Sequence, residues 1–366
     1  MTPRERRTCQ RFATYHAGLS RGNGGAALQE VLRLDLDELD WHGAVTALVG
    51  LLLALVFIGA FGPVGMAAGM AVLFVVAGDS DDQIGPDRSQ VLFVPIGTVV
   101  TLVVGHAADD TLAASIVIAV VTFLTTLLLL LGPRYAVSGG FALMWAVLTL
   151  TIGATDESAG EMALAFAAGG VIALLALSVS QRVVPKEPAE PLPEQGDATP
   201  NGSPTRWTIE LFALVRAVAA GMCVAIGYEF FEDHAAWVVL TFVLVLRPPK
   251  EQTEVVAVGR TLGTLGGVVI GVLAARLVGD ETWSLVLAFL VCGFFMVATT
   301  NVNYALSTAF TTALLLLSQR ILQDDVFSTA WDRILATIIG VTFAFAVIAI
   351  MAATVQVRRQ RAEGRP

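Results

Sequence analysis

The sequence predicts an all-α membrane protein with about 12 transmembrane helices, arranged as two parallel six-helix repeats. The first observation behind this fold class is composition: 55% of the 366 residues are hydrophobic, 14% are charged, and the mean hydropathy is +0.74. Soluble domains carry about 25% charged residues, so this chain has too few to face water on all sides. The second observation is a series of apolar segments, and the third is an internal repeat.

Apolar segments recur along the whole chain. A helix that crosses a hydrocarbon layer of about 30 Å needs about 20 mostly apolar residues. In the first half such segments lie at residues 42–60, 65–77, 91–107, 111–131, 135–153 and 161–180. In the second half they lie at residues 209–228, 235–246, 260–278, 283–299, 304–318 and 331–354. Because several are short, the sequence allows between about ten and twelve transmembrane helices.

The apolar segments divide the chain into five regions. These are a cytoplasmic N-terminal arm (1–41), a first membrane repeat (42–182), a linker (183–206), a second membrane repeat (207–354) and a basic cytoplasmic tail (355–366). The linker contains six prolines and no aromatic residue. Such a segment cannot bury enough apolar surface to offset the entropy of ordering it. We therefore expect a disordered cytoplasmic linker between the two halves.

Basic residues predict the orientation, because Lys and Arg concentrate in cytoplasmic loops. If the chain starts inside, 18 of its 22 basic residues fall on the cytoplasmic side. Arg276, Arg320 and Arg333 then fall on the external side, and Arg216 lies within a helix. Both termini are therefore expected in the cytoplasm.

The two halves repeat each other. The heptapeptide YAVSGGF at residues 135–141 returns as YALSTAF at residues 304–310, an offset of 169. Gly97-Thr98 returns as Gly263-Thr264, an offset of 166. Each half has an even number of predicted helices, so the copies are parallel, and a pseudo-two-fold axis along the membrane normal is expected.

Residues of the second half follow a recognisable order. A helix with Trp237 and Thr241 leads to Arg247-Pro248-Pro249, Arg260 then precedes Gly263-Thr264 and Gly267, and Tyr304-Ala305 opens a later helix. This order resembles the FUSC family, the fusaric-acid-resistance and aromatic acid exporter membrane proteins. The resemblance covers residues 209–354, and the first half is a degenerate copy. There Val94 stands in place of Arg260, and no tryptophan matches Trp237.

The resemblance implies a function and a location. It implies a multi-pass protein of the bacterial inner (plasma) membrane that exports small organic, often aromatic, anions. The path is expected between the repeats. Larger exporters of the family carry a soluble cytoplasmic region, which the linker of this chain is too short to form.

Three arginines are candidates for the anion pathway. Arg216 lies about seven residues into its helix, where a charge either faces an aqueous cavity or a partner, or snorkels to the interface. Arg260 and Arg333 lie nearer the ends of their apolar segments, so snorkelling is the simpler interpretation of each. Arginines without equally embedded acids favour an anionic substrate.

Hydroxyl side chains are expected to line the pathway beside the arginines. They are Thr241, Thr264, Tyr304, Ser307 and Thr311. Helix hydroxyls also bond carbonyls of the preceding turn, so simple packing is the alternative. The short segments 65–77 and 235–246 occupy corresponding positions in the repeats, which favours a site at the repeat interface.

Several other residues have structural interpretations. Gly263, Gly267 and Gly271 share one helical face, which allows another helix to approach closely, and we predict that they form a packing face. Trp237 is predicted to anchor the external membrane interface. His234 is interpreted as a solvated loop residue in preference to a proton relay.

The sequence argues against an enzyme. No nucleophile–base pair, metal-ligand cluster or phosphate-binding glycine loop is visible, and Cys9, Cys223 and Cys292 are scattered. No cofactor, metal or nucleic acid is expected. The expected partners are the lipid bilayer and a small organic anion, and a homo-oligomer is left open.

Two alternatives to a coupled exporter remain open at the sequence level. Glu210, Glu229 and Asp332 lie at the edges of predicted spans, so no acid stands out as a proton-coupling group. The first alternative is therefore a passive anion channel. The second is a non-transporting membrane scaffold of the cell envelope.

Overall fold

The structure is a computed structural model that describes residues 39–78, 86–151, 155, 157–183, 206–231, 236–246, 250–279, 281–321 and 326–362. All regular secondary structure in these ranges is helical. Most of the expected N-terminal arm, linker residues 184–205 and His234 lie outside the described residues.

Each apolar segment of the sequence corresponds to one α-helix. The helices of the first half are α3 (Trp41–Phe61), α4 (Met66–Ala77), α5 (Arg88–Ala107), α6 (Thr111–Leu127), α7 (Pro133–Thr151) and α8 (Ala159–Val183). Those of the second half are α9 (Arg206–Phe231), α10 (Ala236–Val245), α11 (Lys250–Val278), α12 (Thr282–Ala298), α13 (Tyr304–Ile321) and α14 (Val326–Ala362).

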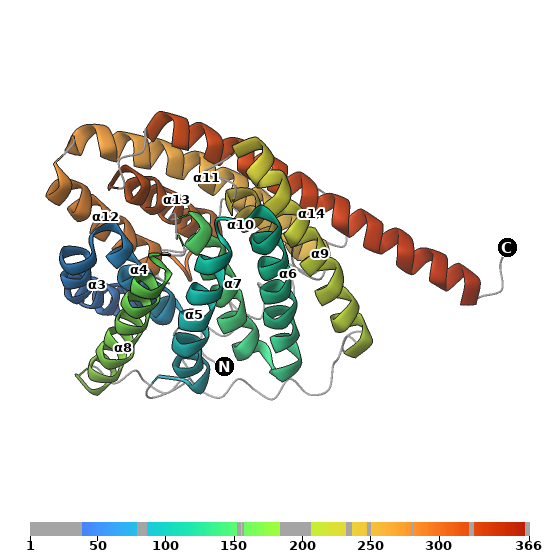
Figure 1. Ribbon diagram of the computed structural model, residues 1–366, viewed down its shortest axis with the longest axis horizontal. Coiled ribbons are helices and arrows are strands. Elements are labelled where there is room, and N and C mark those ends of the chain that lie inside the picture. Colours follow the sequence, from blue (N-terminus) through green and yellow to red (C-terminus); the bar gives the residue numbers. More distant parts are fainter. Residues whose placement is uncertain are drawn as a thin grey trace, which may run out of the picture.

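Two helices, α11 and α14, extend furthest beyond their apolar segments. The helix α11 begins ten residues before Arg260, because its polar first turns contain good helix formers such as Lys and Glu. The helix α14 continues to Ala362, so the expected separate basic tail is largely an extension of the last helix. Figure 1 shows this extension projecting beyond the other helices.

The outer surface of the bundle is apolar. Seven described helices are long and apolar enough to cross a membrane, namely α3, α5, α6 with the short helical turn after it, α8, α9, α11 and α14. Large apolar side chains such as Val56, Leu277 and Phe230 are exposed on them. Such extensive apolar exposure suits lipid contact. The chain is therefore an all-helical membrane protein.

Two short helices lie buried inside the bundle. The helix α4 has 12 residues and α10 has 10, so each is roughly 15–18 Å long and too short to cross a bilayer of about 30 Å. Nearly every residue of both is buried. A helix that is apolar all round is stable in such a position.

Each short helix has similar neighbours in its own half. The helix α4 packs against α3 and α8, and α10 packs against α9 and α14. Gly169 on α8 meets the backbone of α4 at Ala68, and Gly340 on α14 meets the backbone of α10 at Val238. The halves join where α6 packs on α9 and α12 packs on α3. In Figure 1, α11 and α14 run across the direction of α5 and α8.

Candidate anion site

Arg333 is buried in the second half. This α14 side chain has no exposed surface, and its Cζ lies 5.1 Å from the ring centroid of Trp237 on α10. A cation over a desolvated tryptophan ring contributes roughly 2 kcal/mol. Nevertheless, Nε, Nη1 and Nη2 of Arg333 have no hydrogen-bond partner in the described part of the chain.

Arg260 lies beside Arg333. This α11 residue is 2% exposed, and its Nε and Nη2 also have no hydrogen-bond partner among the described residues. The two guanidinium charges repel each other, and Tyr304, the first residue of α13, lies close to both. Four helices of the second half, α10, α11, α13 and α14, thus bring two cations and two aromatic side chains together.

The burial of this arginine pair corrects the expectation that Arg260 and Arg333 snorkel. Each lies about two turns or more inside its helix, because α11 and α14 begin earlier than their apolar segments. Arginine keeps its charge in proteins, and an unpaired buried charge is strongly unfavourable. An anion between the two guanidinium groups would remove their repulsion and satisfy their free donors.

Threonines extend the polar region by one helical turn. Thr264 and Thr337 lie four residues after Arg260 and Arg333, are buried, and have hydroxyl oxygens 3.5 Å apart. Thr337 also donates to the backbone carbonyl of Arg333 at 2.8 Å. Sequence reasoning missed Thr337, although its spacing places it on the same helix face as Arg333.

Thr241 lies on α10, one turn after Trp237. It is fully buried, and its hydroxyl has no hydrogen-bond partner within the described ranges. Gly340 packs directly against it, since an added Cβ on Gly340 would come within 2.7 Å of the Thr241 Cβ. The α10 face that carries Thr241 therefore lies against α14, the helix that also carries Arg333.

Arg216 is not part of the arginine pair. Its Nη1 donates to Thr126 Oγ1 on α6 at 3.2 Å, and its Nη2 donates to the carbonyl oxygen of Val243 in the last turn of α10. Trp237, beside Arg333, is near the opposite end of α10. Arg216 thus neither snorkels freely nor points its hydrogen-bonding groups at the pair.

Ser307 and Thr311 make local hydrogen bonds on α13. Thr311 donates to the carbonyl of Ser307 at 2.8 Å, and Ser307 donates to the carbonyl of Met296 on α12 at 3.4 Å. Both side chains are half-buried. Their hydroxyls therefore have the helix-packing role that the sequence left open as an alternative to lining a path.

Gly263, Gly267 and Gly271 face α13. Side chains at these positions would collide with α13 near Ala305, Ala309 and Ala313. Small residues on both helices allow the two backbones to approach closely. This contact fixes α11, and with it Arg260, against the helix that begins at Tyr304.

The structure places Trp237 differently from the sequence expectation. An interfacial anchor needs an indole ring at the membrane surface, but Trp237 has no exposed surface and lies under Arg333. The physical reason is that α10 is a short internal helix, so its first turn is covered by neighbouring helices. Periodicity cannot distinguish such a helix from one that starts at the interface.

In the first half, aromatic rings pack between α5, α7 and α8. Trp145 stacks on Phe166 with ring centroids 4.6 Å apart, and its Nε1 donates to Thr101 Oγ1 at 2.7 Å. Val94, which aligns with Arg260, is buried against Gly170. Among the described residues, this part of the first half is therefore a packed aromatic core that contains no buried arginine pair.

Comparison with known proteins agrees with this picture. Residues 218–347, which contain Trp237, Arg260, Tyr304 and Arg333, match the model of the fusaric acid resistance protein-like family. The resemblance to this family is confirmed. The match to the family lies within the second half, as the motif order predicts.

Two curated relatives are similar to part of the chain. Inner membrane protein YccS of Escherichia coli (strain K12) is 29% identical over 192 residues, which are 48% of this chain and 26% of that protein. An uncharacterized protein of Haemophilus influenzae (strain ATCC 51907 / DSM 11121 / KW20 / Rd) is 31% identical over 136 residues, 37% of this chain and 19% of that protein. The chain thus matches about a quarter or less of their lengths. No solved structure matches the chain.

Proposed function

We propose that this protein is a transporter that exports small organic anions across the cytoplasmic membrane and that Arg260 and Arg333 bind the anion. The observation that carries the proposal is the buried arginine pair, whose five unpartnered nitrogens have no acceptor within the described residues. An intramembrane charge without a partner is retained for function more often than for stability. The match to the fusaric acid resistance protein-like family supports a transport role.

The surroundings of the pair fit a carboxylate attached to a small apolar or aromatic group. Guanidinium groups bind carboxylates through paired hydrogen bonds, and the ring of Trp237 supplies an apolar surface beside Arg333. Thr264 and Thr337 add hydroxyls one turn away. We therefore expect the negative charge of the ligand to contribute more to binding than the group attached to the carboxylate.

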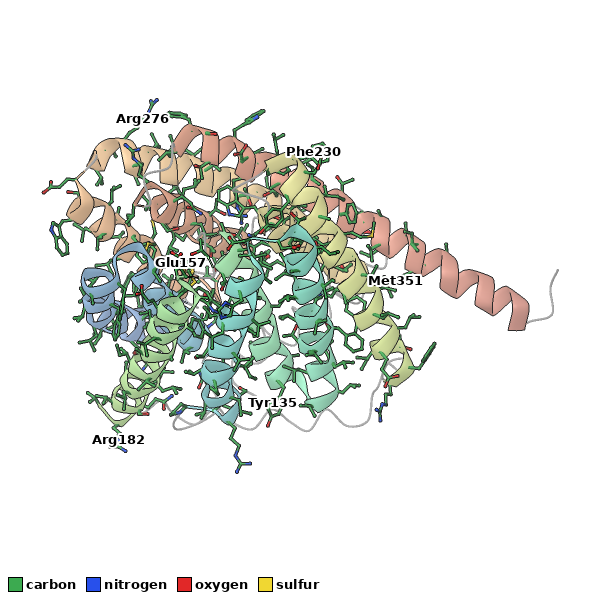
Figure 2. The ribbon with its side chains drawn as sticks, viewed as in Figure 1. Tyr135, Glu157, Arg182, Phe230, Arg276 and Met351 are labelled. Carbon is green, nitrogen blue, oxygen red and sulfur yellow. The ribbon has the colours of Figure 1, made fainter. Side chains whose placement is uncertain are left out.

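The proposal includes two parallel copies of a six-helix unit with both termini in the cytoplasm. The matching neighbours of α4 and α10 support the repeat. In Figure 2, Arg276 and Phe230 lie at one edge of the molecule, and Tyr135 and Arg182 lie at the opposite edge. An alternating path of the chain through the membrane would place the first two outside and the last two inside.

Flux into proteoliposomes tests the proposal. We expect uptake of benzoate by the wild-type protein and loss of at least about tenfold in Arg260→Ala and Arg333→Ala, because each loses a charge-assisted hydrogen bond to the anion. Gly140→Ala is the matched control, since a Cβ there meets no other atom within 4 Å. Undiminished flux in both arginine variants would refute the anion site.

The same vesicles separate the transporter from its alternatives. One observation favours a passive channel. Glu210 and Glu229 lie near the two ends of α9 and Asp332 lies near the start of α14, so none of these acids stands out as a proton-coupling group. Flux that reverses with the applied membrane potential and ignores a pH gradient would assign a channel. Complete absence of flux for aliphatic and aromatic carboxylates would favour the scaffold.

A further inference from the structure

The two short helices end inside the protein, where their last carbonyl groups need donors. The last four carbonyls of any helix lack partners within that helix, and leaving one buried without a donor is unfavourable. In α4, the carbonyl oxygen of Val75 accepts a hydrogen bond from Nε2 of Gln90 at 3.1 Å. Gln90 is neutral and belongs to α5, so both partners are in the first half.

The corresponding donor for α10 is charged and contacts both halves. Arg216 on α9 donates to the carbonyl of Val243 and also to Thr126 on α6 of the first half. Its guanidinium additionally lies 5.9 Å from the ring centroid of Phe212. A cation at a helix C-terminus is further stabilised by the helix dipole. Arg216 therefore joins the end of α10 to the first half.

The other end of α10 carries the proposed anion site. Trp237 lies six residues before Val243, about 9 Å along the helix axis. Arg333 and Arg216 consequently hold opposite ends of one short helix. A change in the position of α6 relative to α10 would act on the contact at Arg216 and, through the rigid helix, on Trp237 beneath Arg333.

We propose that Arg216 is a positioning residue that closes the C-terminal end of α10 and couples it to the first half. This inference rests on the proposed transport function, in which α10 must move for an anion to reach a fully buried site. Here the hydrogen bond between Arg216 and Thr126 joins the two halves and can break. The hydrogen bond between Gln90 and α4, in contrast, lies entirely within the first half. In the proposed topology the C-terminal end of α10 faces the cytoplasm, so opening of the Arg216 contact would uncover this end and give the anion an entrance from the cytoplasmic side.

Cysteine accessibility tests this role directly. The reporter is Val245→Cys, at the fully buried last residue of α10, in full-length protein carrying Cys9→Ala, Cys223→Ala and Cys292→Ala. The protein is placed in lipid nanodiscs, and its labelling by a polar maleimide is timed. We expect labelling to rise about tenfold in Arg216→Ala, since a charge-assisted hydrogen bond contributes a factor of that size to a local opening equilibrium.

Two further variants separate coupling from general loosening. Thr126→Val removes the contact of Arg216 to the first half, together with the bond of the Thr126 hydroxyl to the Thr122 carbonyl within α6, but keeps the bond of Arg216 to α10. It is expected to raise labelling severalfold. Gln90→Leu removes the equivalent contact of α4 and is expected to leave labelling at Val245→Cys unchanged. The proposal would be overturned if Arg216→Ala and Thr126→Val labelled at the same rate as the Val245→Cys reporter alone. It would also be overturned if Gln90→Leu raised the labelling rate as much as they do. If Arg216→Ala does not fold, the Thr126→Val result decides.

The accessibility test and the transport test can give negative results independently of each other. Labelling is measured without an anion gradient, so an unchanged rate would disprove the coupling role of Arg216 while benzoate flux remained. Conversely, absent flux with raised labelling would disprove transport and leave the contact as a structural connection between the halves.

Discussion

Burial of Arg333 removes its guanidinium group from water without giving it a carboxylate partner in the described part of the chain. The contact with Trp237 recovers only part of the lost hydration. Arg260 increases the cost, because a second positive charge lies beside the first. The native state without a bound anion is therefore less stable than the apolar packing around the pair would allow.

A neutral side chain at position 333 should stabilise the protein. Arg333→Met keeps much of the buried volume and removes the charge repulsion. Replacement of buried charges by packed apolar groups is often stabilising by about 1–4 kcal/mol. We expect a higher thermal unfolding midpoint in detergent without organic anions, together with loss of benzoate flux. A lower midpoint in Arg333→Met would mean that the arginine holds the fold together.

Residues of the proposed site were already candidates in the sequence, whereas their surroundings could not be predicted. The family-like order contained Arg260 and Tyr304, and Arg333 was a candidate as an arginine within an apolar segment. Their burial depends on where α11 and α14 begin and on which helices cover them, and hydropathy alone does not carry this information. Arg216 is the opposite case. Its position well inside a helix was evident from the sequence, but its partner Thr126 was not, because it lies 90 residues away along the chain.

At the scale of the helices, glycine determines how closely α14 approaches α10. An added Cβ on Gly340 would lie 2.7 Å from both the Val238 carbonyl oxygen and the Thr241 Cβ. Neither atom belongs to the end of a flexible side chain, so one of the helices would have to shift. Because α14 also carries Arg333, such a shift would move the guanidinium relative to Trp237.

Gly340→Ala is accordingly expected to destabilise the protein. Overpacking of a close contact costs about 1–3 kcal/mol, and here it should also reduce anion flux. Gly140→Ala on α7 has open space around it and should be neutral or stabilising by up to about 1 kcal/mol. Thermal unfolding in detergent distinguishes the two variants. An equal stability change in both would show that helix propensity, and not contact with α10, determines the effect.

Helix positions follow closely from the sequence because the membrane imposes one dominant pattern. All twelve apolar segments correspond to helices, and the largest differences are the polar extensions of α11 and α14. The short lengths of α4 and α10 were also visible in the sequence. Their complete enclosure by longer helices was not, since an apolar run looks the same whether lipid or protein covers it.

At the scale of the whole molecule, the short helices of the two halves have similar neighbours but differ in the chemistry around them. The first half surrounds α4 with aromatic packing such as Trp145 on Phe166, and the second surrounds α10 with the arginine pair. The offsets of 166 and 169 residues in the sequence predicted related halves, and the loss of arginine at Val94 predicted their asymmetry. We therefore expect a single anion site for each chain.

The most direct measurement is the position of an anion in the experimentally determined structure. Crystals soaked with 4-bromobenzoate give an anomalous signal from bromine, which locates the ligand independently of its carboxylate. The account predicts one peak per chain beside Trp237, with the carboxylate between the guanidinium groups of Arg260 and Arg333, and no peak in Arg333→Met. A bromine peak near Trp145 in the first half, or a native site that contains only water, would contradict it.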